Sequence, residues 1–254
     1  MRKILSLSWV IFKEISREKI FYGLLFLGTF FLLSSVILQE MVVGEKFKVF
    51  KDIGLLSPSI TGVLFITVVG ANIISKEINA KTLYVILSKP ISKNGYILSN
   101  FFALILLSTT IIFLITLFGW LFLLINGENW LSGFVTGAYF LFFELLLLSS
   151  ISIFLSTFLS PYLSMITLFI IYISGHSLSN AIQLSQFAKN PPLQYFLKAL
   201  SYIFPNLELF NFKINLVYNL PFPKIAFLYS PLYSIVYSLI FISLSFIVFS
   251  KREL

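Results

Sequence analysis

Long apolar runs separated by short polar or charged segments dominate the chain. A transmembrane helix needs about 20 consecutive, predominantly apolar residues, and each run is close to that length or longer. The runs cover residues 20–38, 58–74, 99–125, 131–158, 163–182 and 225–249. The pattern predicts an all-α integral membrane protein with six transmembrane helices, forming a single transmembrane domain over residues 1–254.

Residues 1–19 differ from these runs because basic and apolar positions alternate at helical spacing. Trp9 belongs to the apolar side, whereas Lys13, Arg17 and Lys19 supply positive charge. This pattern is typical of an amphipathic helix that lies in the membrane interface. A cleavable signal peptide is not expected, because no small-residue cleavage site follows the apolar stretch.

Composition excludes a water-soluble protein. Hydrophobic residues make up 58% of the chain and charged residues 11%, and the mean hydropathy is +0.97. A soluble domain carries roughly a quarter charged residues. The sequence has no cysteine, which excludes disulfides, thiolate metal sites and cysteine nucleophiles.

The net charge of +8 bears on orientation. With six spans, both termini and the charged stretch 75–98 share one side, and that side holds 11 of the 18 Lys and Arg residues. Because basic residues favour the cytoplasmic side, the sequence predicts a multi-pass protein of the cell (inner) membrane with both termini cytoplasmic.

The segment 75–92, between the second and third spans, is charged and contains Pro90. Its first part predicts a helix in which Glu77 and Lys81 form a favourable i,i+4 pair. Pro90 would end this helix, and Ser92 would cap the next one. Such a helix is either a docking point for a soluble partner or a surface connector with no partner.

Residues of this segment resemble a family motif. Glu77, Thr82, Leu83, Leu87, Ser88, Pro90, Ile91, Ser92 and Lys93 are similar to a segment of ABC-transporter permeases of the type-2 exporter class. The nearest resemblance is to the branch of the nitrous-oxide-reductase maturation (copper-processing) permease. Residues 143–164, and Pro205, Asn206, Leu207 and Phe210, resemble further elements of these permeases.

The resemblance implies a permease homodimer that sits on two ABC ATPase subunits and drives export or conformational work on an extracytoplasmic partner. Its elbow helix would contain Trp9, Lys13, Arg17 and Lys19. Its coupling helix would contact the ATPase through Glu77, Lys81, Thr82, Leu83, Val85, Ile86, Ser88 and Pro90. None of the 12 glycines precedes a lysine, so the phosphate-binding G-x-x-x-x-G-K-[ST] loop is absent. ATP and Mg would therefore bind the partner; this chain is expected to be no enzyme and to hold no cofactor or metal.

Glu144 is the only ionisable residue well inside a predicted span. An acid at this depth is either a proton or substrate contact or a neutral group that hydrogen-bonds a neighbouring helix. The sequence places His176 at the outer end of the fifth span, so no titratable partner is expected at the depth of Glu144. This favours the structural role. We interpret His176 as an interfacial hydrogen-bonding group.

Small residues mark the fourth predicted span. Ser149, Ser152 and Ser156 form a stripe, and Gly133 and Gly137 form a GxxxG pair. Both patterns favour close helix packing in membranes, although the serines would also suit a polar lining for a substrate.

The segment 183–224 is semi-polar and rich in aromatic residues, and its part 193–204 predicts an interfacial helix. Tyr202, Pro205, Asn206 and Phe210 are candidates for contact with an extracytoplasmic subunit or with lipid headgroups.

Two functions outside the ABC class stay open. One is a membrane scaffold or sensor that transports nothing, and the other is a proton-coupled secondary transporter that uses Glu144. The sequence does not identify the substrate. Copper transfer is not expected, because beyond the initiator only Met41, Met165 and His176 could serve as soft ligands.

Overall fold

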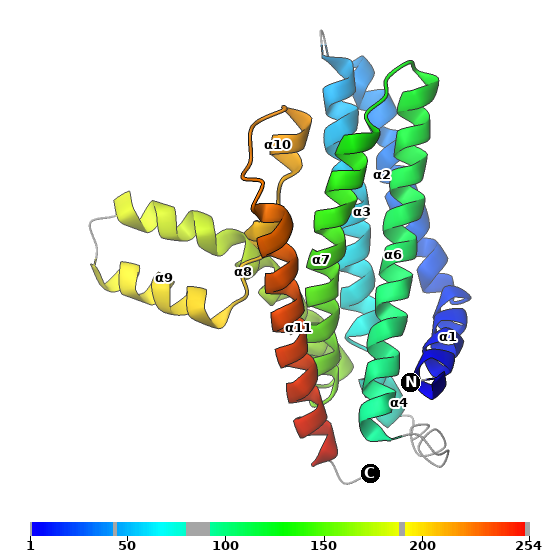
Figure 1. Cartoon of the computed structure of the whole chain (residues 1–254), viewed down its shortest axis with the longest axis vertical. Coiled ribbons are helices and arrows are strands. Elements are labelled where there is room, and N and C mark those ends of the chain that lie inside the picture. The colour runs from blue at the N-terminus through cyan, green and yellow to red at the C-terminus, as the bar shows by residue number, and fades with distance from the viewer. Residues whose placement is uncertain (1, 43–44, 80–91, 188–190, 252–254) are drawn as a thin grey trace.

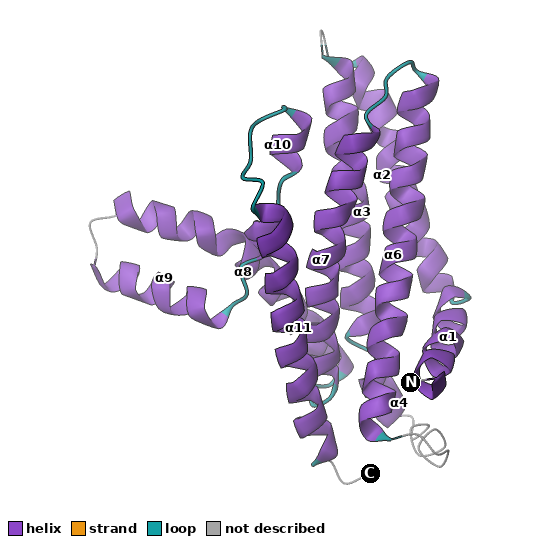
Figure 2. Ribbon diagram, viewed as in Figure 1, coloured by secondary structure: helices purple, strands orange, loops and turns teal. Residues whose placement is uncertain are grey.

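The computed structural model describes residues 2–42, 45–79, 92–187 and 191–251. Within these ranges every regular element is helical (Figure 2). The elements are α1 (Arg2–Ser16), α2 (Lys19–Glu40), α3 (Lys46–Phe65), the π-helix η1 (Ile66–Gly70), α4 (Ile73–Asn79), α6 (Lys93–Ile125), α7 (Leu131–Ser156), α8 (Pro161–Phe187), α9 (Pro191–Ile203), the 3₁₀ helix η2 (Leu207–Phe210), α10 (Lys213–Val217) and α11 (Ala226–Ser250).

The long helices α2, α3, α6, α7 and α11 run side by side as a bundle (Figure 1). The first turn of α1, the end of α4, the start of α6 and the end of α11 lie at one end, which we call the connector end. The turn 126–130 lies at the opposite end, the turn end. Both ends of the described chain therefore lie at the connector end, which agrees with the predicted common side of the termini.

Five helical stretches of the described residues are long and apolar enough to cross a membrane: Lys19–Glu40, Lys46–Ile78, Lys93–Ile125, Leu131–Ser156 and Ala226–Ser250. They correspond to five of the predicted spans. The second begins at Lys46, whereas the sequence predicted a loop as far as residue 57.

Lys51, in the early part of α3, contacts residues at the turn end. Lys51 forms an ion pair with Glu128 at 3.2 Å and lies 5.5 Å from the ring centre of Trp130. The contacts of Lys51 thus hold the early part of α3 to the turn 126–130.

The predicted fifth span, residues 163–182, lies inside α8, but α8 is not among the five candidate spans of the described residues. Figure 1 shows the C-terminal part of α8, together with α9, projecting from the bundle as an arm. The expected helix 193–204 corresponds to α9. The six-span count is therefore not confirmed.

Much of the predicted coupling helix lies outside the described residues. Lys81, Thr82, Leu83, Val85, Ile86, Ser88 and Pro90 all fall within residues 80–91. α4 contains Glu77, at the start of the segment. The predicted cap of α6 is confirmed, because the Oγ of Ser92 accepts a hydrogen bond from the Gly95 amide at 3.1 Å.

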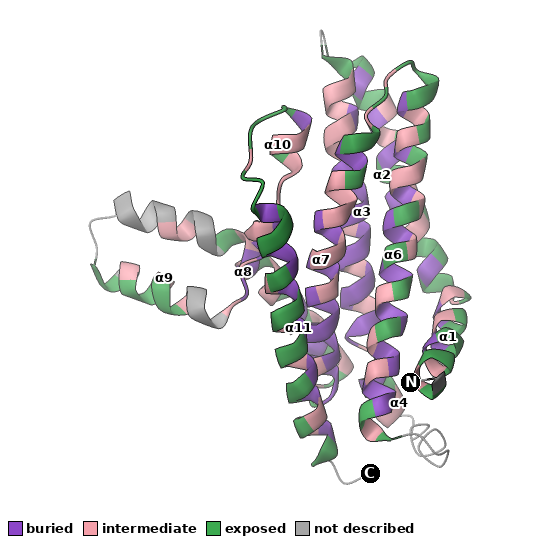
Figure 3. Cartoon of the chain, viewed as in Figure 1, coloured by how far each residue is buried: buried purple, intermediate pink, exposed green. Residues whose placement is uncertain are grey.

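The core lies between α3, α6 and α7 (Figure 3). In their apolar windows, 72% of the α3–α4 residues and 67% of the α7 residues are buried, against 22% in α2 and 28% in α11. α3 and α7 are thus the central helices, while α2 and α11 present apolar side chains outward, as lipid-facing helices do.

Candidate functional site

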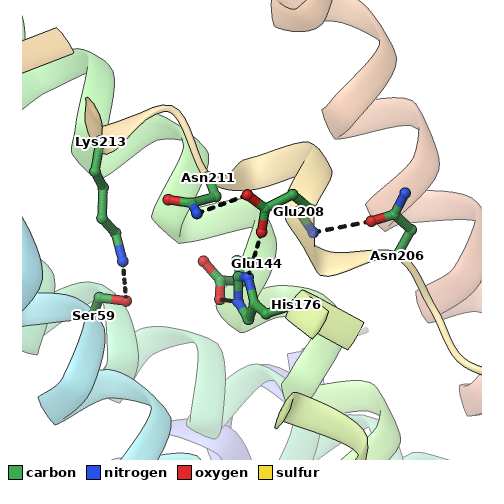
Figure 4. Close-up of polar contacts among 7 residues, drawn as sticks. All are labelled: Ser59, Glu144, His176, Asn206, Glu208, Asn211 and Lys213. Atoms are coloured by element: carbon green, nitrogen blue, oxygen red, sulfur yellow. Dashed lines mark hydrogen bonds and ion pairs between the residues drawn. The ribbon is translucent and has the colours of Figure 1, made fainter. Parts of the chain in front are cut away.

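The most unusual feature of the bundle is a histidine between two carboxylates (Figure 4). His176 of α8 places its Nε2 3.0 Å from a carboxylate oxygen of Glu144 on α7. Its Nδ1 lies 3.1 Å from a carboxylate oxygen of Glu208 on η2. One imidazole therefore joins three elements that are far apart in the sequence.

The two contacts of His176 limit which groups can act as donors. A neutral imidazole donates through one nitrogen only, and an ionised carboxylate only accepts. For His176 to hydrogen-bond both Glu144 and Glu208, either the imidazole is positively charged or one carboxyl group is protonated.

The three side chains of this cluster differ in how far they are buried. Glu144 is 1% exposed, whereas the side chains of His176 and Glu208 are 21% and 33% exposed. The ring of Tyr172 packs against the His176 ring with centroids 4.8 Å apart. A carboxylate as deep as Glu144 is costly unless it is paired, so His176 stabilises it directly.

The turn that carries Glu208 is shaped by its neighbours. The side chain of Asn206 accepts a hydrogen bond from the Glu208 amide at 3.1 Å and caps η2. The side-chain amide of Asn211 donates to the other Glu208 oxygen at 3.0 Å. The Asn206 amide donates to the hydroxyl of Tyr233 on α11 at 2.9 Å. Glu208 is therefore held in position from both sides of η2.

Lys213 links the same region to α3. Its Nζ donates to the Oγ of Ser59 at 2.7 Å. Burial lowers the pKa of Lys213, and the carboxylates of Glu144 and Glu208 act in the opposite direction. The residues from Asn206 to Lys213 are thus fixed to α3, α8 and α11 by polar contacts.

The space beside Glu144 is too small for an organic substrate. A cavity of about 10 Å³ lies between α7 and α10 and is lined by Glu144 and Lys213 among others. This volume holds about one water molecule. In this conformation the cluster can hold a proton and join helices, but it does not enclose a ligand.

The position of His176 corrects the sequence interpretation. His176 was expected at the outer end of a span that ends near residue 182, with no titratable partner for Glu144 at its depth. His176 lies within α8, which continues past it to Phe187, and it is within hydrogen-bond distance of Glu144 near the middle of α7. The acid consequently has a partner.

Sequence reasoning missed four members of this region: Ser59, Glu208, Asn211 and Lys213. The available signal was weak. Glu208 and Lys213 are two charged residues in a short, mostly apolar stretch that follows Pro205 and Asn206.

The serine stripe of α7 is buried and turned toward its own helix. The hydroxyl groups of Ser149 and Ser156 donate to main-chain carbonyls of α7, at 2.7 and 2.8 Å. Ser152 lies 3.5 Å from a carbonyl oxygen of η1. The described structure therefore shows packing at these serines.

The GxxxG pair has two different environments. A Cβ added at Gly137 would lie 2.5 Å from Leu55, so α7 approaches α3 closely there. At Gly133 the nearest atoms belong to Trp130, so this glycine makes room for the aromatic ring that precedes α7.

The residues predicted to contact an extracytoplasmic partner are largely buried within the chain. Pro205 is buried and Phe210 is 2% exposed, while Asn206 makes the contacts described above. Tyr202 belongs to α9, and its side chain is outside the described part. The three described side chains fix η2 to the bundle.

At the connector end, α1 packs on α6. The Oγ of Ser99 donates to the Ile4 carbonyl at 3.2 Å, while Trp9 is 50% exposed. Lys13 lies over the Trp9 ring at 5.7 Å. Arg17 and Lys19 are exposed where α1 ends and α2 begins.

α4 is attached at the same end. The Tyr96 hydroxyl of α6 donates to the carboxylate of Glu77. Lys76 lies 3.7 Å from Glu18, between α1 and α2. The base of the segment 75–92 is thus tied to both neighbouring parts of the bundle.

Comparison with known proteins gives the family. No curated protein matches the chain in a sequence search. The model of the family described as "ABC-2 family transporter protein" matches residues 28–254, which is most of the chain. The match covers α3 to α11 and most of α2, including the Glu144–His176–Glu208 cluster. The chain therefore belongs to the ABC-2 transporter family, as a membrane-spanning permease component and not an enzyme.

Proposed function

We propose that this permease converts ATP hydrolysis on a separate ATPase subunit into movement of its membrane helices, for export or for conformational work on an extracytoplasmic partner. One observation carries the proposal. A nearly continuous helical stretch, α3–η1–α4, leads from the polar cluster to the connector end.

This stretch has contacts at both ends that suit such a role. Near the cluster, Ser59 of α3 is bonded to Lys213. At the connector end, Glu77 of α4 is bonded to Tyr96 of α6. Between them lies η1, a π-helical segment, and such segments are frequent at functional sites. A displacement of α4 would be transmitted along α3–η1–α4 to Ser59, and from Ser59 through Lys213 to the turn that carries Glu208.

In this proposal the connector end faces the cytoplasm, and the segment 75–92 docks on the ATPase as a coupling helix. ATP and Mg bind that partner. Basic residues at α1 and α4 support the orientation, because positive charge concentrates on the cytoplasmic side.

Two further features belong to the proposal. α8 forms the sixth span in the assembled membrane complex, and two copies of the chain form a dimer. Apolar side chains of α8 that are half exposed or more, such as Leu163, Ile166 and Ile170, are consistent with burial in lipid or against the second copy. The branch-level resemblance, to the nitrous-oxide-reductase maturation permease, remains a prediction, and the substrate stays open.

The experiment is co-purification of the tagged permease in mild detergent. We expect an ATPase with a phosphate-binding loop at about one copy per permease. The double variant Val85→Asp, Ile86→Asp should lose this ATPase, because charge on an apolar docking face prevents its burial. Ile125→Asp is the matched control, since Ile125 is 84% exposed at the turn end. Retained assembly and ATP-driven activity in the double variant would contradict the coupling assignment.

Proton-coupled transport has one observation in its favour. His176 supplies the titratable partner that a proton relay through Glu144 requires. Vesicles that contain the permease alone would then take up protons along a pH gradient, and Glu144→Gln would stop this uptake. A scaffold or sensor function predicts instead an assembled complex with no transport-linked ATP hydrolysis.

A further inference from the structure

His176 contacts two carboxyl groups that depend on it to different degrees (Figure 4). Glu144 is 1% exposed, and a carboxylate at this depth is costly without a partner. Glu208 is 33% exposed, so water reaches it, and it also accepts a hydrogen bond from Asn211 at 3.0 Å. Glu208 can therefore lose its contact with His176 at little cost, whereas Glu144 cannot.

Helix α8 is closely packed on the turn that carries Glu208. A Cβ added at Gly175 would lie 2.8 Å from the Pro205 carbonyl oxygen and 2.7 Å from the Leu207 side chain. His176 follows Gly175 directly, so its contact with Glu208 lies at this close approach. The C-terminal part of α8 continues from here into the arm that it forms with α9 (Figure 1). This point is therefore where the turn is joined to the arm.

The turn has other attachments that do not involve α8. The Ser230 hydroxyl of α11 donates to the Leu209 carbonyl at 2.7 Å. Lys213 donates to Ser59 of α3 at 2.7 Å. If the contact with His176 is lost, the turn stays on α11 and α3, and α8 is the element that loses its polar contact with the turn.

The two contacts of His176 can both be hydrogen bonds only while the cluster holds an additional proton, on the imidazole or on one carboxyl group. A neutral imidazole donates through one nitrogen, and an ionised carboxylate only accepts. When the proton is lost, neutral His176 can donate to Glu144 or to Glu208 but not to both. The bond to Glu144 is then retained, because an unpaired carboxylate costs more in the interior than one that water reaches.

The charges around His176 are consistent with its positive form. The described ionisable side chains that surround it are Glu144 on α7, Glu208 on η2, Lys213 at the start of α10 and Tyr172 on α8 itself. η1 has no ionisable residue, Tyr233 of α11 accepts from the Asn206 amide, and Tyr195 and Lys198 of α9 are exposed. Tyrosine is uncharged near neutral pH, so protonated His176 and Lys213 would balance the two carboxylates.

We propose that His176 is a proton-dependent latch between α7, α8 and the Glu208 turn. With the additional proton bound, its imidazole holds Glu144 and Glu208 together and keeps the arm in the conformation of Figure 1. Without that proton, His176 stays with Glu144 and the arm separates from the turn. The latch needs neither proton transport nor an ATPase, so it stands apart from the function proposed above.

The first experiment measures the position of the arm at two pH values. The chain has no cysteine, so Phe196→Cys on α9 and Leu239→Cys on α11 introduce the only sites for thiol-reactive spin labels. Both positions are exposed, at 60% and 62%. Labelled chains are diluted with unlabelled ones in lipid nanodiscs, so that pulsed electron paramagnetic resonance reports distances within one copy. We expect one distance at about pH 5 and a second, longer one at about pH 9, on either side of the range in which histidine changes its charge.

Glu208→Gln separates the latch from a general effect of pH. The amide of glutamine donates to the Nδ1 of a neutral imidazole, whose Nε2 still donates to Glu144. This variant therefore needs no additional proton and should keep the low-pH distance at both pH values. Glu128→Gln is the matched control, because Glu128 pairs with Lys51 in the turn 126–130, and it should keep the wild-type response.

The same distance at both pH values in the wild type would overturn the proposal, and so would a wild-type pH response in a folded Glu208→Gln variant. Loss of the response in Glu128→Gln would overturn it as well, because a carboxylate outside the cluster would then control the arm. None of these outcomes involves the ATPase, so ATP coupling is tested independently by the co-purification described above.

Discussion

Helix α7 contains two buried polar regions that behave in opposite ways. Around Glu144, a side chain leaves its own helix and is bonded to His176 on α8. Nearer the connector end, Ser149 and Ser156 are equally buried, but their hydroxyls return to carbonyls of α7. Both regions consist of polar residues in a membrane helix, yet only the first links α7 to α8 through a contact between a carboxyl group and an imidazole.

The difference lies in the length and charge of the side chains. A serine hydroxyl is satisfied by its own helix and leaves a small, smooth surface for a neighbour. A glutamate cannot be satisfied in this way, because its charge must be paired or neutralised within the membrane. The cluster should therefore determine how the Glu208 turn is attached, whereas the serines determine how closely helices approach.

The largest expected effect comes from removing the deep acid. Glu144→Ala removes the carboxyl group that faces His176, and leaves His176 in contact with Glu208 alone. Breaking one side of a buried ion pair costs about 3 kcal/mol, and we expect a loss of this size in thermal unfolding of the detergent-solubilised permease.

The matched control for this change is Glu144→Gln, which keeps a hydrogen-bonding side chain of the same length. We expect it to lose about 1 kcal/mol. Equal melting of Glu144→Ala and the wild type would mean that the cluster does not hold the helices together.

The second prediction tests whether the serine region of α7 matters because small residues let helices pack closely, and not because its hydroxyl groups are polar. A Cβ at Gly70 would lie 2.4 Å from the Ser152 hydroxyl and 3.2 Å from Leu104. Gly70→Leu should therefore push η1 away from α7 and cost about 2 kcal/mol of stability by overpacking. The measurement is again thermal unfolding in detergent.

Gly23→Leu provides the control, because nothing lies within 4 Å of a Cβ at this position of α2. Leucine is the better helix former, so this variant should be neutral or more stable by up to about 1 kcal/mol. If both leucine variants gave the same change, close packing at η1 would not be the reason for a small residue there.

The sequence was sufficient for the regular part of the bundle. α7 and α11 begin and end within about two residues of the predicted limits, because long apolar runs leave little choice of structure in a membrane. The cap at Ser92 was also predicted, since a serine after a proline-ended helix is a local signal.

The polar cluster could not be predicted from a local pattern, because such a pattern does not show which distant residues come into contact. Glu144, His176 and Glu208 are separated by 32 residues at each step, and their contact depends on where α8 and η2 are placed. The sequence placed His176 near the end of a span, whereas α8 continues past it to Phe187. Hydropathy could not show this, because the extension is too polar to read as part of a span.

The smallest expected effect completes the comparison of the two α7 regions. Ser149→Ala removes a hydroxyl whose acceptor is a carbonyl of its own helix, 2.7 Å away. The helical hydrogen bond to that carbonyl remains, and alanine is the better helix former, so we expect a change within about 0.5 kcal/mol. Ser234→Ala is the matched variant, because this hydroxyl crosses from α11 to the Phe143 carbonyl of α7 at 2.6 Å. Its loss should cost about 1 kcal/mol, the usual net value of one hydrogen bond. If Ser149→Ala melted at a lower temperature than Ser234→Ala, the Ser149 hydroxyl would stabilise the fold by more than leaving a small packing surface. The serines and Glu144 would then not differ in the way described above.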